Sequence, residues 1–402
     1  MKIKIDTVLT RLGAGGPPVV CVTLTRGLTS KGYEARLLVG RCDERHDRDM
    51  SYLLRPHDSV HWIPSMSRAL SPIGDILALW RLFQAFRRTK PDIVHTHTAK
   101  AGTLGRVAAR LAGVPVVVHT FHGNVLGGYF CPTVSRIVRA IEWCLGHLTD
   151  HVCVVSEQQA RELSGTYRVI PRSKVRVVRL GLELDRFRRL GDSPRRTLGI
   201  TVGWLGRFVP IKNLELLAEI VACCVRREIP VRFIVAGDGP RQTLVLDLVD
   251  RFGPSIVEWT GWVGAVESVI ERCDVLIQTS KNEGTPVALI QGMAARRPFV
   301  STAVGGENDM TEGPVLRAKG GSRWFANAVL CEPRPESFAD ALEELAYQRD
   351  VLGKMGSRAA VFSRNFEFDA LVRNLDELYR ELLVAKGRMM PEAPVLEELT
   401  IR

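Results

Sequence analysis

The chain has 402 residues, of which 46% are hydrophobic and 25% charged, a composition typical of a packed globular protein with two domains. No apolar run approaches the roughly 18 residues that a bilayer crossing requires. The N-terminal segment is interrupted by charges and indicates a first strand rather than a signal peptide. Nine cysteines without a C-x-x-C pair indicate reduced thiols.

The formal net charge of +11 is concentrated in the N-terminal half of the chain. Residues 1–180 contain 26 Lys and Arg against 13 Asp and Glu, whereas the remainder contains 29 against 31. This asymmetry favours an anionic partner for the N-terminal half, such as anionic lipid, nucleic acid or an anionic substrate. An arginine-rich composition that simply reflects the source genome is the alternative.

Strand-like and helix-like segments alternate along residues 1–180, which predicts a Rossmann-like domain with a doubly wound parallel sheet. The expected strands are 2–9, 35–40, 92–96, 115–120, 151–155 and 175–178. The expected helices are 17–30, 71–88, 103–111, 135–148 and one that begins near residue 157.

Residues 181–198 are charged and irregular, and we predict an interdomain linker there. The alternation then restarts and predicts a second Rossmann-like domain over residues 199–365. Its expected strands are 201–205, 232–236, 257–260, 274–278 and 298–302, and its helices 213–226, 241–250, 266–271, 286–296 and 335–348. Residues 366–402 should form a C-terminal helix that packs back on the N-terminal domain, and a loose tail.

Ligands bind at the carboxyl ends of the strands in such sheets, so the site should lie between the two domains. The segment NEGTPVALIQGMAARRPFVSTAVGG gives the strongest indication. It places Glu283 and Gly284 in a loop, Thr285 as the cap of a helix, and Pro286 at the first helical position. The start of a helix attracts phosphate, and an adjacent carboxylate can bind hydroxyl groups.

The first strand of the N-terminal domain is followed by a glycine-rich loop that contains Gly15 and Gly16. Glycines allow the backbone to approach a phosphate closely. However, Pro18 replaces the third glycine of a dinucleotide-binding motif, and a plain tight turn is an equal alternative.

Four histidines follow two neighbouring strands of this domain: His95, His97, His119 and His122. A neutral imidazole at a strand end can donate to a sugar hydroxyl or a developing charge. Since the His95–His97 pair has no evident third ligand nearby, hydrogen bonding at the cleft wall is favoured over metal binding. His119 has a buried structural role as an equal alternative, whereas His122, beside Gly123, indicates function.

The first strand of the C-terminal domain is followed by Gly206 and Arg207 and then by Lys212, a pair of cations suited to a diphosphate. The next strand ends in a second glycine-containing loop, with Gly237. Asp47-Arg48-Asp49 has the form of a metal-binding Asp-x-Asp motif, but it lies in a run of charges and is interpreted as a solvated loop.

Together these segments resemble the retaining glycosyltransferases of family GT4. The resemblance covers nearly the whole chain and includes PDIVHTHTAKAGTLGRVAARLAGVPVVVHTFHG, VGWLGRFVPIKN, FIVAGDGP and EGTPVALIQGMAARRPFVSTAVGG. It implies an α/β GT-B fold, in which two doubly wound Rossmann-like domains face each other across a cleft.

The resemblance also implies roles for individual residues. Arg207 and Lys212 match the pair that holds the donor diphosphate, Glu283 the carboxylate that contacts the transferred sugar, and His122 a cleft histidine near that sugar. The substrate-binding backbone would involve these positions: Gly15, Gly16, Gly206, Gly237, Gly284, Thr285 and Pro286. The family uses no metal, so we expect no metal and no cofactor.

One position departs from the family motif, because Gln291 stands where a second glutamate normally binds the ribose hydroxyls. Glutamine retains one carbonyl acceptor and no charge. The loss of one or two hydrogen bonds predicts nucleotide binding weaker by about 0.5–3 kcal/mol.

The sequence therefore predicts a hexosyl- or N-acetylhexosaminyltransferase, with a UDP-sugar as the favoured donor and a glycan or lipid-linked acceptor hydroxyl. A cytoplasmic protein is expected, with peripheral contact at the inner face of the plasma membrane through the basic N-terminal domain. The amphipathic helix 71–88 is the candidate for this contact, and a core-packed helix is the alternative. A catalytically idle sugar-nucleotide-binding protein, an epimerase or phosphorylase, and a nicotinamide-dependent oxidoreductase are the rival functions. Nucleic-acid binding is disfavoured because aromatics are only 7%.

Overall fold

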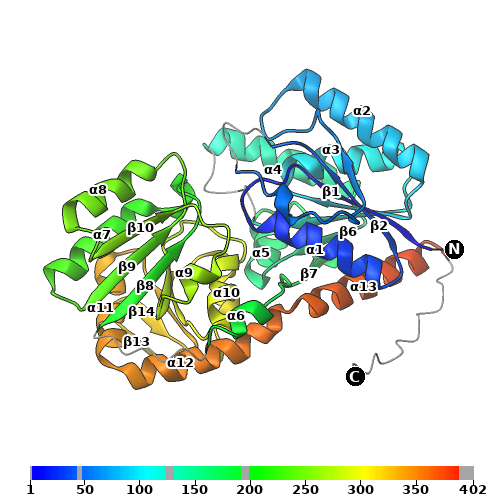
Figure 1. Cartoon of the computed structure of the whole chain (residues 1–402). Helices are drawn as coiled ribbons and strands as arrows, with labels where there is room; N and C mark the ends of the chain where they lie inside the picture. Colours follow the sequence, from blue (N-terminus) through cyan, green and yellow to red (C-terminus); the bar gives the residue numbers. More distant parts are fainter. Residues whose placement is uncertain (1, 43–47, 124–125, 127–130, 192–198, 389–402) are drawn as a thin grey trace.

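The computed structural model describes residues 2–42, 48–123, 126, 131–191 and 199–388. Its strands form two sheets, one from each half of the chain (Figure 1). The predicted pair of Rossmann-like α/β units is confirmed. Among the described residues, no helix has both the length and the apolar character needed to span a membrane.

The first sheet contains seven parallel strands in the order β3-β2-β1-β4-β5-β6-β7. Every residue of its central strands β4 and β5 is buried, as expected when helices cover both faces of a parallel sheet. The strands are β1 (Lys4–Leu9), β2 (Glu34–Val39), β3 (Val60–Trp62), β4 (Ile93–His97), β5 (Val116–Phe121), β6 (His151–Val154) and β7 (Val175–Val177).

The second sheet has the order β10-β9-β8-β11-β12-β15-β14-β13, in which the last two strands run antiparallel to their neighbours. Its strands are β8 (Ile200–Leu205), β9 (Val231–Ala236), β10 (Val257–Gly261), β11 (Val275–Gln278), β12 (Phe299–Thr302), β13 (Arg317–Lys319), β14 (Ser322–Trp324) and β15 (Ala328–Cys331). The sequence did not predict β3, β13, β14 or β15. The first three have three residues each, too few to establish a period of two, and the four residues of β15 are all buried and show no alternation.

Most helices agree with the predicted alternation, with small shifts at their ends, whereas the helices over 185–188 and 349–362 were not predicted. In the N-terminal half they are α1 (Gly16–Ser30), α2 (Pro72–Thr89), α3 (Ala99–Leu111), α4 (Pro132–His147) and α5 (Glu157–Arg161). Further along are α6 (Asp185–Arg188), α7 (Leu214–Arg226), α8 (Gln242–Phe252), α9 (Glu267–Ile270), α10 (Val287–Ala294), α11 (Pro335–Tyr347), α12 (Arg349–Phe362) and α13 (Phe368–Ala385).

The segment predicted as a linker is partly folded, which corrects the sequence interpretation. Residues 185–188 form α6, and the side chains of Leu182, Leu184 and Phe187 are buried in a core that also contains residues of both sheets. The charged residues between them made this segment look irregular in sequence. Residues 192–198 lie outside the described residues.

Helix α13 packs against the N-terminal half although it ends the chain. Figure 1 shows it running beneath the first sheet, close to α1. Tyr379 is fully buried and its hydroxyl lies 2.5 Å from Nδ1 of His95, while Tyr33 of the N-terminal half donates to Asp376. These contacts hold α13 on the N-terminal half.

Candidate functional site

Loops from both sheets meet at the carboxyl ends of their strands. The loop after β5 contains His122 and Gly123, and the loop after β11 contains Gly284. A Cβ atom on Gly284 would lie 2.1 Å from the carbonyl oxygen of His122, so only glycine allows this approach. The sequence predicted both residues for the site, and the structure brings them into contact.

Two helices, one from each half, begin at this same place. A Cβ atom on Gly16, the first residue of α1, would lie 2.9 Å from Cγ2 of Val287, the first residue of α10. Gly15 precedes α1 at its N-cap position with a φ of +150°, a backbone conformation that favours glycine. Helix starts carry partial positive charge and free N–H groups, so this place is suited to an anion.

The cap of α10 differs from the predicted one. The hydroxyl of Thr285 donates to the carbonyl of Val155 at 3.3 Å, which ties the loop to the N-terminal half instead of capping the helix. Pro286 occupies the N-cap position and α10 begins at Val287, one residue later than predicted. The N–H groups at the start of α10 therefore receive no side-chain cap from that position.

Glu283 and Lys212 form an ion pair in the loop region at the ends of β8 and β11. Oε1 of Glu283 also accepts hydrogen bonds from Ser280 at 2.6 Å and from Gln278 at 2.9 Å. Burial raises the pKa of the Glu283 carboxyl, but the charge of Lys212 and these hydrogen bonds outweigh it and hold the pKa below its ordinary value. Glu283 is therefore an anion stabilised by three donors.

The two glycine-containing loops of the second sheet lie against each other. A Cβ atom on Gly237 would lie 1.9 Å from the carbonyl oxygen of Gly206, and Gly237 has a φ of +141°. Arg207 follows directly and is partly buried. Beside it, Asp238 forms an ion pair with Arg48 of the N-terminal half, with 2.8 Å between Nη2 and Oδ2.

This pair corrects the interpretation of 47–49 as a merely solvated loop. Arg48 is 64% exposed, yet it crosses to the second sheet at the loop that carries Gly237. Its carbonyl also accepts a hydrogen bond from the N–H of Ala14, in the predicted glycine-rich loop. Asp47 lies outside the described residues. The segment therefore connects the two halves beside the candidate site.

The four histidines separate into two kinds. His95 hydrogen-bonds Tyr379 and Thr120, and His119 lies 2.9 Å from the hydroxyl of Thr96. Both are nearly fully buried, and burial lowers their pKa values, that of His95 to about 3. This geometry supports the structural alternative for His119.

His97 and His122 are bonded to each other, with 2.8 Å between Nδ1 of His97 and Nε2 of His122. Burial lowers the pKa of His122 to about 4, so its imidazole is neutral near pH 7. His122 is only partly buried, so its neutral imidazole is available as a hydrogen-bond donor or acceptor.

Gln291 lies on α10 and is 9% exposed. Its side chain carries no charge, in contrast to the carboxylate that the resemblance implies at this position. The weaker nucleotide binding expected from Gln291 stays a prediction.

Sequence reasoning did not identify Glu307, which follows Gly305 and Gly306 after β12. Its side chain is fully buried, and neither carboxylate oxygen has a hydrogen-bond partner among the described residues. Burial, together with the nearby charge of Glu283, raises its pKa well above the ordinary value. Its position at the carboxyl end of a strand was the signal that could have identified it.

Protein-family models match both halves of the chain. The model for Glycosyltransferase Family 4 matches residues 14–186, and the model for glycosyl transferases group 1 matches residues 199–348. The two matches together include every residue that the sequence placed in the candidate site.

Curated relatives are similar over much of the chain. One is the UDP-Gal:alpha-D-GlcNAc-diphosphoundecaprenol alpha-1,3-galactosyltransferase of Escherichia coli, 29% identical over 62% of this chain and 68% of the relative. Another is the D-inositol 3-phosphate glycosyltransferase of Thermobispora bispora, 24% identical over 94% of this chain and 92% of the relative.

Solved structures share the fold. HepE of Anabaena, in complex with UDP and glucose, superposes with a TM-score of 0.73 at 18% identity, covering 94% of this chain and 99% of HepE. The sucrose-phosphate synthase of Thermosynechococcus elongatus gives a TM-score of 0.76 at 17% identity, covering 96% and 100%.

Proposed function

Because the chain belongs to glycosyltransferase family GT4 and has the GT-B fold, we propose that it transfers the sugar of a UDP-sugar donor to an acceptor hydroxyl. The anomeric configuration of the sugar is retained in this transfer. The observation that carries this proposal is the meeting of α1 and α10 at their starts, beside His122 and the Lys212–Glu283 pair. The names of the Escherichia coli relative and of the HepE complex, which both include UDP, support the choice of base.

The proposed donor site holds the diphosphate with cations and helix starts. Cleavage of the donor leaves negative charge on the diphosphate, and Arg207, Lys212 and the start of α10 stabilise that charge as it develops. In this role the positive groups take the place of a divalent metal, and the proposed transfer needs no metal and no cofactor.

Glu283 and His122 orient the transferred sugar through its hydroxyl groups. Since three donors hold Oε1 of Glu283, this carboxylate is a poor covalent nucleophile and a good fixed acceptor. Retention then follows from reaction on one face of the sugar, with the leaving phosphate taking the acceptor proton.

We further propose a lipid-linked acceptor and peripheral docking on an anionic membrane. The alternative for helix 71–88 was packing in the core. One face of α2 does not pack in this way, because the side chains of Ile73, Ile76 and Trp80 are 83%, 69% and 53% exposed. Arg87 and Arg88 are exposed on the same helix. Exposed apolar side chains beside cations are typical of a helix that lies in a membrane interface.

Helix α4 adds to the same surface. Helices α2, α3 and α4 lie side by side on the first sheet (Figure 1), and Ile137, Ile141 and Trp143 of α4 are 56%, 44% and 54% exposed. Arg139 of α4 is not part of this exposed surface, because it stacks on the ring of Tyr167 and donates to the carbonyl of Leu126.

A thermal-shift screen of the full chain against UDP, GDP, ADP, their sugars and NAD tests the donor. A ligand at 100 times its Kd stabilises the folded state by about 2.7 kcal/mol. UDP and UDP-sugars should raise Tm, and GDP, ADP and NAD should not. A shift with NAD alone would contradict the proposal.

The second candidate function is a catalytically idle sugar-nucleotide-binding protein, which is suggested by Gln291. Measurement of turnover distinguishes it from a transferase. If the chain is a transferase, UDP should be released from a UDP-sugar in the presence of membrane lipid extract when the protein is added, and not when it is left out. Binding of UDP without any turnover would favour the idle protein.

A further inference from the structure

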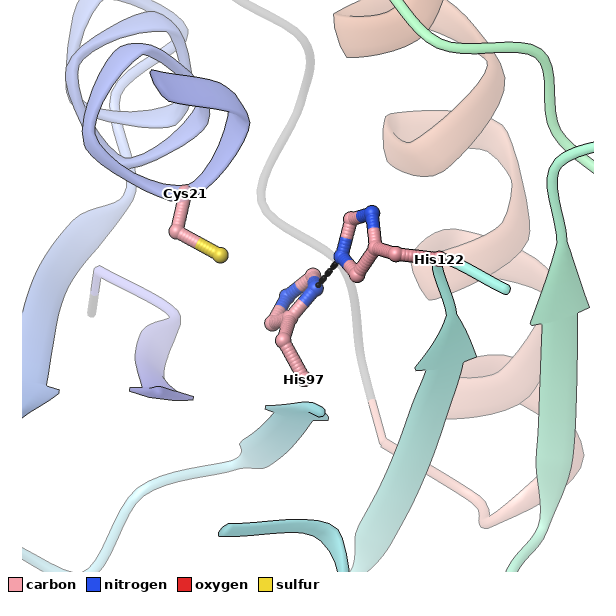
Figure 2. Close-up of side chains that lie close together, drawn as sticks. All are labelled: Cys21, His97 and His122. Atoms are coloured by element: carbon pink, nitrogen blue, oxygen red, sulfur yellow. Dashed lines mark hydrogen bonds between the residues drawn. The ribbon is translucent and has the colours of Figure 1, made fainter. Parts of the chain in front are cut away.

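Three side chains with metal-ligating atoms lie together at the carboxyl end of the first sheet. Cys21 comes from α1, His97 from the end of β4 and His122 from the loop after β5. One ligand atom of each residue lies within 4.8 Å of the other two. Figure 2 shows the thiol and the two imidazoles grouped around the same space.

The polar groups of this cluster are incompletely satisfied. His97 is 1% exposed, and its Nε2 has no hydrogen-bond partner among the described residues. Cys21 is fully buried and forms no disulfide. Because buried polar nitrogens normally have a partner, an unpaired one beside a free thiol indicates a missing ligand.

The chemistry of the cluster selects the class of ligand. One thiolate and two neutral imidazoles match the ligands that zinc prefers, at bond lengths of about 2.0–2.3 Å. An imidazole ligates through the nitrogen that carries no proton, and a thiol ligates as the thiolate, so binding of the cation displaces the proton of Cys21. The ligand atoms need to move inward by about an ångström for such bond lengths.

We propose that Cys21, His97 and His122 form a binding site for a zinc-type divalent cation, and that the bound cation inhibits the enzyme. The cation bonds to the sulfur and to one nitrogen of each imidazole, and the thiol proton leaves to the solvent. The cation takes Nε2 of His97, the nitrogen without a partner, and Nε2 of His122. The hydrogen bond from Nδ1 of His97 to Nε2 of His122 is lost, and each ring keeps its proton on Nδ1.

The inhibitory part rests on the proposed function, because His122 is also the proposed sugar-orienting residue. An imidazole bound to the cation loses the nitrogen lone pair or the proton that a sugar hydroxyl would use. The cation is therefore not a cofactor of the transfer but a competitor for one of its residues. The fourth position of a tetrahedral site would face the space between the two halves, through which the cation enters.

Metal binding is tested on the full chain without reference to activity. Chelator-treated protein is titrated with Zn²⁺ against a chromophoric competitor, and with Co²⁺ while the near-ultraviolet thiolate-to-cobalt absorption is recorded. Wild type should bind one cation with the thiolate absorption, and Cys21→Ser should bind at least about 100-fold more weakly, since loss of even an outer partner costs 10–100-fold.

Two matched variants act as controls. Cys153 is as buried as Cys21 and lies on β6 of the first sheet, outside the cluster, and Cys144 is exposed on α4. Cys153→Ser and Cys144→Ser should keep wild-type affinity and absorption. Equal affinity in wild type and Cys21→Ser, or absorption that disappears in Cys144→Ser, would overturn the site. If Cys21→Ser does not fold, His97→Gln serves in its place, with the same expected loss.

The inhibitory link is tested by the ratio of turnover with and without Zn²⁺ in each protein. Zn²⁺ should reduce turnover in wild type and in Cys153→Ser, and should have little effect in Cys21→Ser. Site-specific binding without inhibition would overturn the link to His122 and leave the site in place. A chain that turns over no donor would contradict the proposed function, while the binding titration would still decide the metal site.

Discussion

Lys212 and Glu283 bind each other in the structure, although the sequence placed them on different parts of the donor. The ammonium of Lys212 lies on Oε1 of Glu283, and both side chains are less than one-fifth exposed. A lysine predicted for the diphosphate and a glutamate predicted for the sugar are thus one electrostatic unit. In the proposed donor site, the phosphate and the sugar would therefore contact the two partners of one ion pair.

The pair predicts a stability effect for Lys212→Ala. Removing the cation leaves a buried carboxylate without its charge partner, which costs about 3–5 kcal/mol. Tm should fall by several degrees, and the double variant Lys212→Met/Glu283→Gln should regain most of it. Lys281→Ala, an exposed lysine of the same loop region, is the control and should leave Tm unchanged. An equal Tm in Lys212→Ala and wild type would show that the pair has no structural role.

Arg207→Ala should reduce kcat by about 10²–10³, the range for loss of one group that stabilises developing charge. The Kd for UDP should change less, because this interaction strengthens as the diphosphate leaves. Steady-state kinetics and calorimetry measure the two effects. Arg207→Lys keeps the charge but not the two-pronged geometry and should recover part of kcat. A kcat equal to that of wild type would remove Arg207 from the mechanism.

Gln291→Glu should tighten UDP binding by a few-fold to about 100-fold, the reverse of the 0.5–3 kcal/mol lost with one or two hydrogen bonds. Calorimetry with UDP and with 2′-deoxy-UDP measures it. The gain should be smaller for the deoxy compound, which lacks one ribose hydroxyl. Equal gains for both nucleotides would mean that position 291 does not contact the ribose.

Glu307 predicts a pH dependence of stability. Its folded pKa is raised above the ordinary 4.5. An acid with a raised folded pKa costs no stability below 4.5, and costs more as pH rises from 4.5 towards the folded pKa. The unfavourable contribution of the Glu307 carboxylate to stability therefore grows as pH rises above 4.5.

Glu307→Gln has the shape of the protonated acid and cannot ionise. It should therefore raise Tm near pH 7 and leave Tm near pH 4.5 unchanged. Glu336→Gln, on the exposed first turn of α11, is the control and should show no such pH-dependent difference. If Tm depends on pH in the same way in wild type and in Glu307→Gln, the raised pKa of the buried Glu307 carboxyl is contradicted.

The exposed face of α2 predicts membrane binding. The protein should sediment with vesicles that contain anionic lipid at low salt and dissociate as salt shortens the Debye length. Ile76→Ser/Trp80→Ser should lose binding without a change in Tm, because both side chains are exposed. Leu316→Ala, equally exposed on the second half, should bind like wild type. Sedimentation that is indifferent to these variants would exclude α2 as the contact.

The alternation of periods was sufficient to predict every strand of the two sheets except β3, β13, β14 and β15, because each longer element carries its own signal. It was not sufficient for α12, where Gly353 and Gly356 obscure the helical pattern. A Cβ atom on Gly356 would lie 2.4 Å from the carbonyl oxygen of Arg296, so this glycine permits contact with the chain just after α10. Such a contact joins residues that are distant in sequence, and no local pattern indicates it.

The site residues were predictable where a strand end and a suitable side chain coincide, as at His122, Arg207 and Glu283. Clusters of side chains that come from different elements were not predictable. The sequence did not indicate a third ligand near His97, because Cys21 lies on α1 and comes close to His97 only in the folded chain. The cap assigned to Thr285 was wrong for the same reason, since its actual partner, Val155, belongs to the other half.

The position of α13 has a consequence for the order in which the protein acquires its structure during synthesis. The surface that receives Leu375, Tyr379 and Leu383 belongs to α1 and to strands of the first sheet, which are synthesised long before α13. That surface stays uncovered until α13 leaves the ribosome. A nascent chain that has completed its first sheet therefore still exposes apolar side chains that only its own C-terminal helix can cover. We expect truncation before residue 368 to yield an aggregating N-terminal half rather than an independent domain.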